Sequence, residues 1–197
     1  MNPSTTTVRL AVFAALAALT AALAGCGKSG AAAASTGQAN AGTLAVNAQM
    51  ASDLPLDDLQ DFEDAKRGFI ARPSGKILAD DGSTLIDFDA FTFVKGPAPE
   101  TVNPSLWRHA VLNAQVGLFK VVDGIYQLRG FDVANMTLIE GRSGWIVVDA
   151  LTSRESAKAA LAFARQHLGN KPVSAIVFTH SHIDHFGGAL GVMSADE

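Results

Sequence analysis

The feature that most constrains this chain is a histidine-rich segment near its carboxyl end. Three of the five histidines, His180, His182 and His185, lie within six positions, together with Asp184. They directly follow residues 173–178, a near-continuous apolar run typical of a strand that is covered on both faces. Layered α/β sheets place ligand-binding residues at the carboxyl ends of such strands. The segment therefore predicts an α/β sheet with a metal site at one edge.

The spacing of these four side chains predicts two neighbouring metal ions. Residues two apart on an extended loop face the same way, so His180 and His182 can hold one ion through neutral imidazole nitrogens. Asp184 and His185 lie where a helix should begin, so they aim at a second ion roughly 3.5–4 Å away. Zinc suits these ligands best, with iron and manganese as alternatives. Asp184 is also the candidate catalytic residue, and the competing interpretation is a turn whose histidines bind nothing.

Short strands are predicted upstream of this segment. Asp123-Gly124 is a strong hairpin signal between two apolar runs, and a second pair of runs repeats the plan around residues 141–144. The expected strands are residues 118–122, 125–128, 136–140 and 145–149. Four strands therefore arrive in succession before the apolar run that leads to the histidines.

A helix is expected between the fourth of these strands and residues 173–178. Thr152 and Glu155 have capping-box spacing. The apolar face that follows consists of Ala157, Ala160, Leu161, Ala164 and Leu168. Strand, helix and strand then form a right-handed crossover unit, which layers helices on the sheet.

Three further titratable residues lie near these elements. Asp149 ends the fourth strand, where its carboxylate could accept the free ring N–H of a ligand histidine or cap the following helix. Both interpretations stay open from sequence alone. His109 and His167 lie outside the cluster, and His167 falls in the last helical turn, where positive charge is favourable. We expect structural roles for both.

The first residues have the layout of a secretory signal. An apolar run at residues 10–23 follows Arg9 and is closed by small residues, so we expect residues 1–25 to be a signal peptide. The run is shorter than the roughly 20 residues of a membrane-spanning helix. Leu23-Ala24-Gly25-Cys26 resembles a bacterial lipobox, and Cys26 is the only cysteine, so we expect its lipidation. The protein should be exported to the periplasmic side and lipid-anchored, or otherwise periplasmic or secreted.

The residues between the signal and the strands carry weaker signals. Residues 26–53 are rich in small and polar side chains and are expected to be a flexible linker. Residues 54–116 form an amino-terminal lead-in segment, with a helix from Pro55 to Gly68 that buries Leu56, Leu59 and Phe62, and an alternating strand at 84–94. The net charge of −4, with no basic cluster, argues against binding of nucleic acid.

The histidine-rich segment resembles a known family signature. His180-x-His182-x-Asp184-His185, set between an apolar strand and Gly187-Gly188, is similar to the metal-binding loop of the metallo-β-lactamase superfamily. This resemblance implies an α/β fold of the αββα sandwich type, of which residues 117–197 would supply the amino-terminal half. The superfamily includes lactamases, thiolesterases, nucleases and sulfatases, so the loop alone does not select a substrate.

Other segments resemble the linear alkyl sulfatases, the family of dodecyl sulfate hydrolases. They are residues 61–63, 67–70, 101–108, 124–130 and 135–141, and the resemblance runs from about Leu56 to Glu197. It implies that the four loop residues help bind two zinc ions, which activate water to cleave a small-molecule alkyl sulfate ester. Ala150 departs from the family pattern, which has proline after the aspartate.

The resemblance also implies parts of the family beyond this sequence. Two further carboxylate ligands, another histidine and a dimerisation region follow in the family, so a homodimer is expected only for the full-length member. We therefore expect an amino-terminal fragment that is inactive by itself. The alternatives are another hydrolase of the same fold, a lactamase or a thiolesterase, and a truncated lipoprotein without activity.

Overall fold

The computed structural model of this chain describes residues 37–193. The predicted signal peptide and Cys26 lie outside the described residues. The helices are α2 (Ala41–Asp53), α3 (Gln60–Lys66), α4 (Pro104–Asn113), α5 (Arg154–Leu168), α6 (Ile183–Phe186) and the short 3-10 helix η2 (Ala189–Gly191). The strands are β1 (Phe69–Ala71), β2 (Lys76–Leu78), β3 (Thr84–Asp87), β4 (Gly117–Val122), β5 (Ile125–Arg129), β6 (Met136–Glu140), β7 (Trp145–Val148) and β8 (Val173–Val177).

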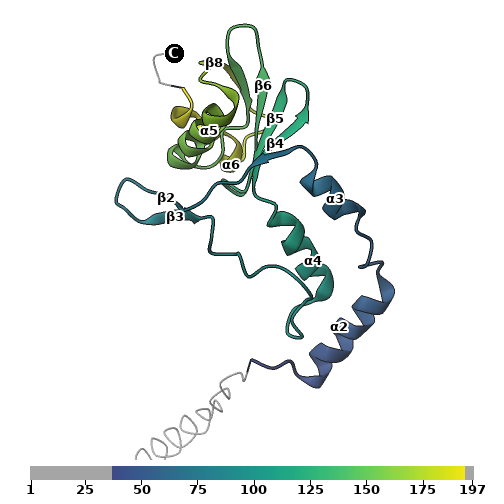
Figure 1. The fold of residues 1–197 in the computed structure, drawn as a ribbon. Coiled ribbons are helices and arrows are strands. Elements are labelled where there is room, and N and C mark those ends of the chain that lie inside the picture. Colours follow the sequence, from purple (N-terminus) through teal and green to yellow (C-terminus); the bar gives the residue numbers. More distant parts are fainter. Residues whose placement is uncertain (1–36, 194–197) are drawn as a thin grey trace, which may run out of the picture. The chain divides into compact units, whose positions relative to one another are not determined.

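The central element is a six-stranded sheet in the order β1-β4-β5-β6-β7-β8 (Figure 1). Neighbouring strands are antiparallel except β7 and β8, which are parallel and joined through α5. The hairpin predicted at Asp123-Gly124 is confirmed, with Gly124 at φ +75° in the left-handed region that glycine tolerates. The second predicted hairpin is also confirmed, so these four strands follow from local sequence signals.

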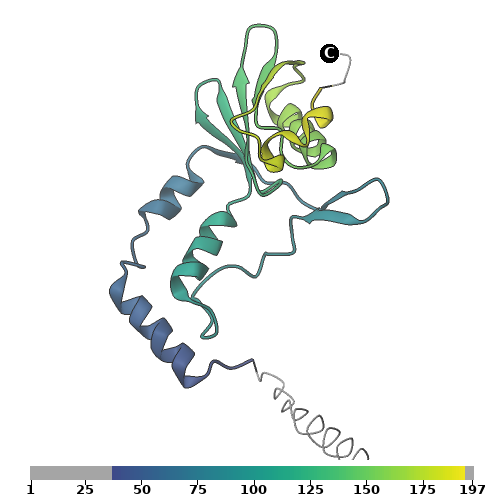
Figure 2. The ribbon, with the colours of Figure 1, turned by 180° about the vertical axis from the view of Figure 1, so that it is seen from behind.

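Helix α5 covers one face of this sheet (Figures 1 and 2). Its predicted apolar face is confirmed, because Ala157, Ala160, Leu161 and Ala164 are buried against Leu138 and Val147 of the sheet, among others. The helix begins one residue later than predicted. Ser153 caps it by accepting a hydrogen bond from the Ser156 N–H, at 3.0 Å.

Thr152, which was predicted to cap α5, bonds elsewhere. Its hydroxyl donates to the Asp132 carboxylate at 2.8 Å, and its backbone N–H donates to the same group at 3.0 Å. The buried Ser156 hydroxyl donates to it as well, at 2.7 Å. Asp132 therefore ties the start of α5 to the loop after β5.

Strand β8 is less covered than the sequence predicted. Its apolar run suggested burial on both faces, but in the described part of the chain β8 pairs with β7 alone and lies at the edge of the sheet. None of its residues is fully buried, although Val173 and Ile176 pack partly buried against the core. Val177 is 49% exposed and Phe178 is 47% exposed. The six-stranded sheet thus has a helical layer on one face, which agrees with half of an αββα arrangement, and β2 and β3 pair antiparallel in a separate two-stranded sheet.

Helix α2 lies where the sequence predicted a flexible linker, so that prediction was wrong for Ala41–Asp53. The Asn40 side chain caps the helix by accepting from the Thr43 N–H at 2.9 Å. Alanine favours helix intrinsically, and no residue of α2 is buried. The helix therefore follows from local preferences together with its contact with α4 and the hydrogen bonds from the Asn47 side chain to the Glu100 and Val102 carbonyls.

The lead-in segment also differs from its prediction. Helix α3 begins at Gln60 rather than near Pro55, and Leu59 is exposed instead of buried. Strand β3 ends at Asp87, short of the predicted end at residue 94. The sequence analysis missed α4, although Asn103 caps it and Pro104 occupies its first turn. None of the described helices is long and apolar enough to cross a membrane.

Candidate metal centre

The predicted ligands lie at the carboxyl ends of the two parallel strands. Asp149 directly follows β7, and Thr179 and His180 follow β8, while Asp184 and His185 lie on α6 (Figure 1). The Asp149 N–H donates to the carbonyl of Val177 at 2.9 Å, which extends the β7–β8 pairing to the start of the loop. Strand register thus brings Asp149 beside residues about 30 positions later in the chain.

The loops after β7 and β8 interlock through their backbones. The Ala150 N–H donates to the His185 carbonyl at 2.7 Å, and the Gly188 N–H donates to the Leu151 carbonyl at 2.9 Å. Asp149 and Leu151 adopt positive φ angles of 60° and 64°. A Cβ on Gly188 would lie 2.1 Å from the Ala150 carbonyl oxygen, so only glycine fits there. The two loops therefore pack closely at Gly188.

His180 and His182 form the first donor pair. The Nε2 atom of His180 lies 3.1 Å from Nδ1 of His182, and the ring centroids are 4.6 Å apart. Two nitrogens bound to one tetrahedral zinc at about 2.05 Å would be about 3.3 Å apart. The two imidazoles are therefore spaced as ligands of one ion.

Asp184 and His185 form the second donor pair. Oδ2 of Asp184 lies 3.2 Å from Nε2 of His185, and the other ring nitrogen, Nδ1, lies 2.8 Å from Oδ2 of Asp149. A neutral imidazole carries one ring proton, which can satisfy only one of these carboxylates. A second proton or a metal cation is needed between Nε2 and Asp184. The arrangement therefore fits a cation at the second position.

The environment of Asp149 keeps its carboxylate ionised. Asp149 is only 7% exposed, and this burial acts to raise the pKa of its carboxyl. Hydrogen bonds from the Thr179 N–H, the His185 ring and the Thr179 hydroxyl outweigh burial and hold the pKa below its usual value. The same bond to Asp149 is the main cause that raises the pKa of His185. Asp149 contacts His185, which the sequence predicts as a ligand, whereas Ser153 caps the helix.

Within residues 37–193, no three His, Cys, Asp or Glu side chains are grouped so that they could hold one metal ion. The predicted ligands instead form two pairs, with the His180 and His185 rings 4.0 Å apart between them. Catalytic zinc usually has three protein ligands. The donor chemistry therefore fits metal, and each pair would supply two ligands of a coordination shell.

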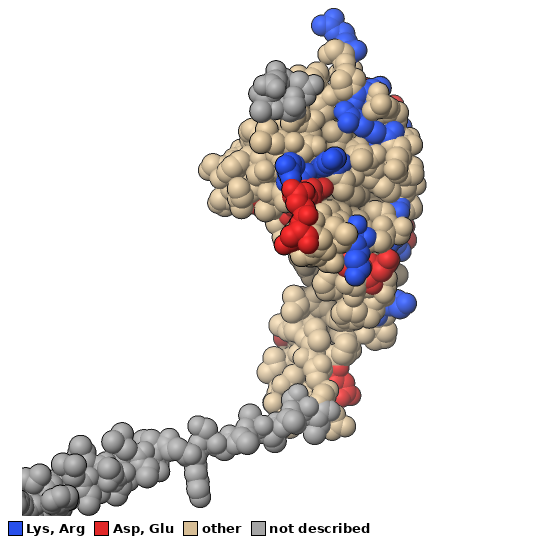
Figure 3. All heavy atoms as spheres, turned by 90° about the vertical axis from the view of Figure 1, so that its left-hand side faces the viewer, with Lys and Arg blue, Asp and Glu red and all other residues tan. Residues whose placement is uncertain are grey.

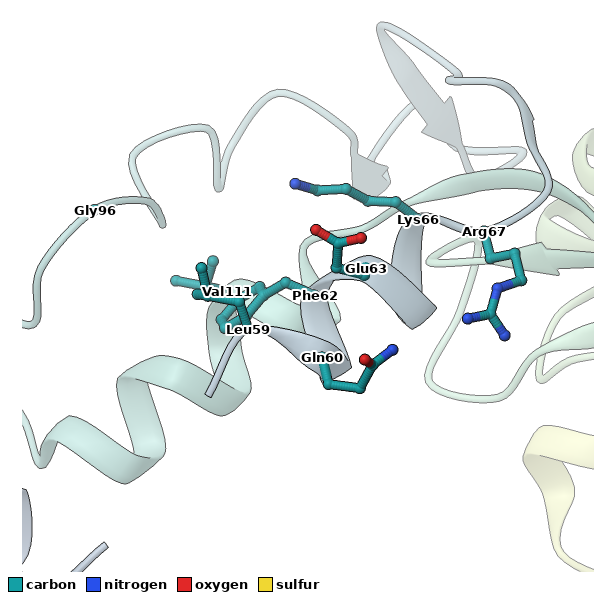
Figure 4. A pocket seen from close by; sticks show the side chains of 8 residues that line it. All are labelled: Leu59, Gln60, Phe62, Glu63, Lys66, Arg67, Gly96 and Val111. Carbon is teal, nitrogen blue, oxygen red and sulfur yellow. The ribbon is translucent and has the colours of Figure 1, made fainter. Parts of the chain in front are cut away.

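The other titratable and hollow regions lie apart from this loop. His167 packs against Phe163 in the last turn of α5, as predicted, and His109 is exposed on α4. A hollow of about 640 Å³ between α3, α4 and Gly96 shares no lining residue with the loop (Figure 4). On the face shown in Figure 3, basic side chains lie among acidic ones instead of forming one basic surface.

Comparison with known proteins shows which proteins this chain is similar to. The Metallo-beta-lactamase superfamily matches residues 129–196. An (R)-specific secondary-alkylsulfatase from a Pseudomonas species is 50% identical over 156 residues, which cover 79% of this chain and 24% of the relative. The chain is a homologue of the alkylsulfatases. The resemblance inferred from the sequence is thereby confirmed, together with the metallo-β-lactamase type of fold.

Further relatives support the same relationship for this alkylsulfatase homologue. A linear primary-alkylsulfatase from a Pseudomonas species is 46% identical, and an alkyl/aryl-sulfatase from Saccharomyces cerevisiae is 44% identical, each over 77% of this chain. The solved structure of the stereoselective inverting sec-alkylsulfatase Pisa1 from Pseudomonas has 51% identity and a TM-score of 0.75, covering 79% of this chain and 25% of that one. The chain spans about a quarter of the length of these relatives.

The sequence analysis found all four donor residues but assigned no role to Thr179. The Thr179 hydroxyl lies 2.8 Å from Oδ2 of Asp149 and 3.0 Å from Nδ1 of His180. The only signal in the sequence is its position next to His180. The contact with Asp149 depends on the pairing of β7 with β8, which local sequence does not encode.

Proposed function

We propose that this chain carries the first ligand loop of a zinc-dependent hydrolase of alkyl sulfate esters. The strongest support is that two pairs of donor side chains lie together at the carboxyl ends of β7 and β8, in a chain that is similar to alkylsulfatases. His180 and His182 would hold one zinc ion, and Asp184 and His185 a second. Asp184 thus acts as a ligand at the reacting centre, in keeping with its proposed catalytic role.

Zinc, when bound, supplies Lewis acidity and a bound water of lowered pKa, which can act as a nucleophile near neutral pH. The residues of this chain orient the site. Asp149 accepts the Nδ1–H of His185, so that Nε2 is left to face Asp184 and the ion. The buried Asp149 side chain is also held by Thr179, which keeps this acceptor in place. Each pair offers two ligands, so the proposal requires further ligands from outside residues 37–193.

The assay for this proposal is release of inorganic sulfate by the zinc-loaded protein encoded by the complete gene. Dodecyl sulfate and 2-octyl sulfate are suitable primary and secondary esters. We expect sulfate release from at least one of them and no turnover of nitrocefin or of a thioester. Turnover of nitrocefin or of the thioester without any sulfate release would assign the protein to another branch of the superfamily.

Replacing His182 with alanine should remove one ligand from the first donor pair. We expect bound zinc to fall by about one ion per chain and sulfate release to fall at least about 100-fold, since even outer-shell changes at metal sites cost 10–100-fold. His109→Ala is the matched control, because His109 is exposed on α4. Zinc content is measured by elemental analysis. Equal zinc content and activity in the two variants would contradict the assignment.

We further propose that the protein is exported and carries a lipid on Cys26. The support is the apolar segment that ends in Leu23-Ala24-Gly25-Cys26. Cys26→Ser should abolish incorporation of radiolabelled palmitate and move the protein from the membrane fraction to the soluble periplasmic fraction. Ala24→Ser, which keeps the cysteine, serves as the control. Equal labelling of the Cys26→Ser variant and the parent would exclude lipidation at this residue.

A further inference from the structure

Thr179 connects a buried carboxylate to a ligand histidine. Its hydroxyl lies 2.8 Å from Oδ2 of Asp149 and 3.0 Å from Nδ1 of His180. Its backbone N–H donates to Oδ1 of Asp149 at 2.9 Å, which fixes the residue against the carboxylate. The hydroxyl therefore lies between the Asp149 carboxylate and the His180 imidazole, with Nδ1 of His185 at the longer distance of 3.5 Å.

The number of protons on each group determines which group donates and which accepts in each hydrogen bond. An ionised carboxylate only accepts, so the single proton of the Thr179 hydroxyl is donated to Asp149. The hydroxyl oxygen can then only accept from His180, which places the His180 proton on Nδ1. In a neutral imidazole this leaves Nε2 as a lone-pair donor. That atom is the one that faces Nδ1 of His182 at 3.1 Å.

Asp149 has the same effect on the second donor pair without an intermediary. Its Oδ2 accepts directly from Nδ1 of His185 at 2.8 Å, so Nε2 of His185 is the free nitrogen, and it faces Asp184. One carboxylate thus contacts one histidine of each pair, directly in the second and through a hydroxyl in the first.

We propose that Thr179 is a positioning residue whose hydroxyl links Asp149 to His180 by two hydrogen bonds. Through this link and its direct bond to His185, one buried carboxylate determines which ring nitrogen is free to bind metal in each donor pair. The metal-binding part of this inference rests on the proposed function, whereas the tautomer part stands on the geometry alone. Two consequences differ between the residues. Loss of the Thr179 hydroxyl should affect only the His180 pair, and loss of the Asp149 charge should affect both.

The first test reads the histidine tautomers in the metal-free full chain. Two-bond proton–nitrogen correlations are recorded on ¹⁵N-labelled protein at a pH of about 8, above the usual histidine pKa of about 6.5. We expect a proton on Nδ1 of both His180 and His185 in the parent, with Nε2 of His180 left unprotonated. Thr179→Val, which keeps the shape but removes the hydroxyl, should move His180 to the Nε2–H form and leave His185 unchanged. Thr179→Ser should match the parent, and Asp149→Asn should change both rings.

The second test measures zinc binding by competition with a chelator. Thr179→Val should lower the zinc affinity of the His180 pair by about 10–100-fold and leave the affinity of the second pair unchanged. Thr179→Ser should restore the affinity of the parent. An unchanged His180 tautomer in Thr179→Val would overturn the proposed link, and so would equal loss in the valine and serine variants. A parent that shows both Nδ1–H tautomers but binds no zinc would support the link and count against the proposed function.

Discussion

Replacing Gly188 with alanine is expected to destabilise the chain by at least about 3 kcal/mol, the upper end of the range for overpacking. The added Cβ would lie 2.1 Å from the Ala150 carbonyl oxygen, 2.5 Å from that of Ser153 and 2.8 Å from the Cβ of Ala157. All three belong to buried backbone or to the face of α5 that contacts the core, so none can move aside cheaply. Urea unfolding followed by circular dichroism measures the loss.

Gly42→Ala is the control for this change. Gly42 lies in α2, where the nearest atom to a new Cβ is Oδ1 of the capping Asn40 at 3.3 Å, which needs to shift by only a few tenths of an ångström, and the φ of Gly42 is not positive. Alanine favours helix by up to about 1 kcal/mol over glycine. We expect no loss of stability in this variant. If Gly188→Ala unfolded at the same urea concentration as the parent, the close packing of the two loops would be refuted.

Replacing Trp145 with alanine should cost about 3–5 kcal/mol, as is usual for a large buried aromatic side chain. Trp145 is 1% exposed and packs edge-on against Tyr126, with ring centroids 5.9 Å apart. The Nζ atom of Lys171 lies 4.9 Å from its ring centre, which adds a cation–π contact. Loss of the ring would leave a cavity in the core beside Tyr126.

Trp145→Phe should be much milder, at about 1.5 kcal/mol or less. The indole Nε1 is buried and has no hydrogen-bond partner among the described residues, so phenylalanine breaks no hydrogen bond and removes an unsatisfied donor. The same urea titration compares the two variants, and zinc binding by folded molecules should be unchanged in both. A phenylalanine variant as unstable as the alanine variant would show that an unseen partner holds the indole N–H.

Local sequence signals predicted the elements that depend mainly on contacts between residues close in sequence. Asp123-Gly124 produced the β4–β5 hairpin, and the apolar spacing of α5 matches its buried face. The four candidate donor residues could be proposed from the sequence because they are neighbours in it, and their role as ligands stays a prediction. Their division into two pairs also followed from local geometry, since His180 and His182 share an extended stretch and Asp184 and His185 lie on α6.

The parts that were not predicted depend on contacts between distant residues. Burial of β8 was overestimated because apolar composition does not say how many neighbours a strand has. The bonds from Thr179 to Asp149 arise only from the register of β7 and β8. Helix α4 is a different case, because the Asn103-Pro104 signal was present and was overlooked. Helix α2 shows that propensity can form a helix without a buried face.

The position of β8 at the sheet edge makes this chain prone to pair with other molecules. Within the described residues one side of β8 has no neighbouring strand, so its peptide groups can accept an added strand from another molecule. The exposed apolar side chains of Val177 and Phe178 would pack against such an added strand. Concentrated solutions are therefore prone to aggregate by edge-to-edge pairing of β8. A segment that pairs with β8 would also restrict the motion of the histidine-rich loop that follows it.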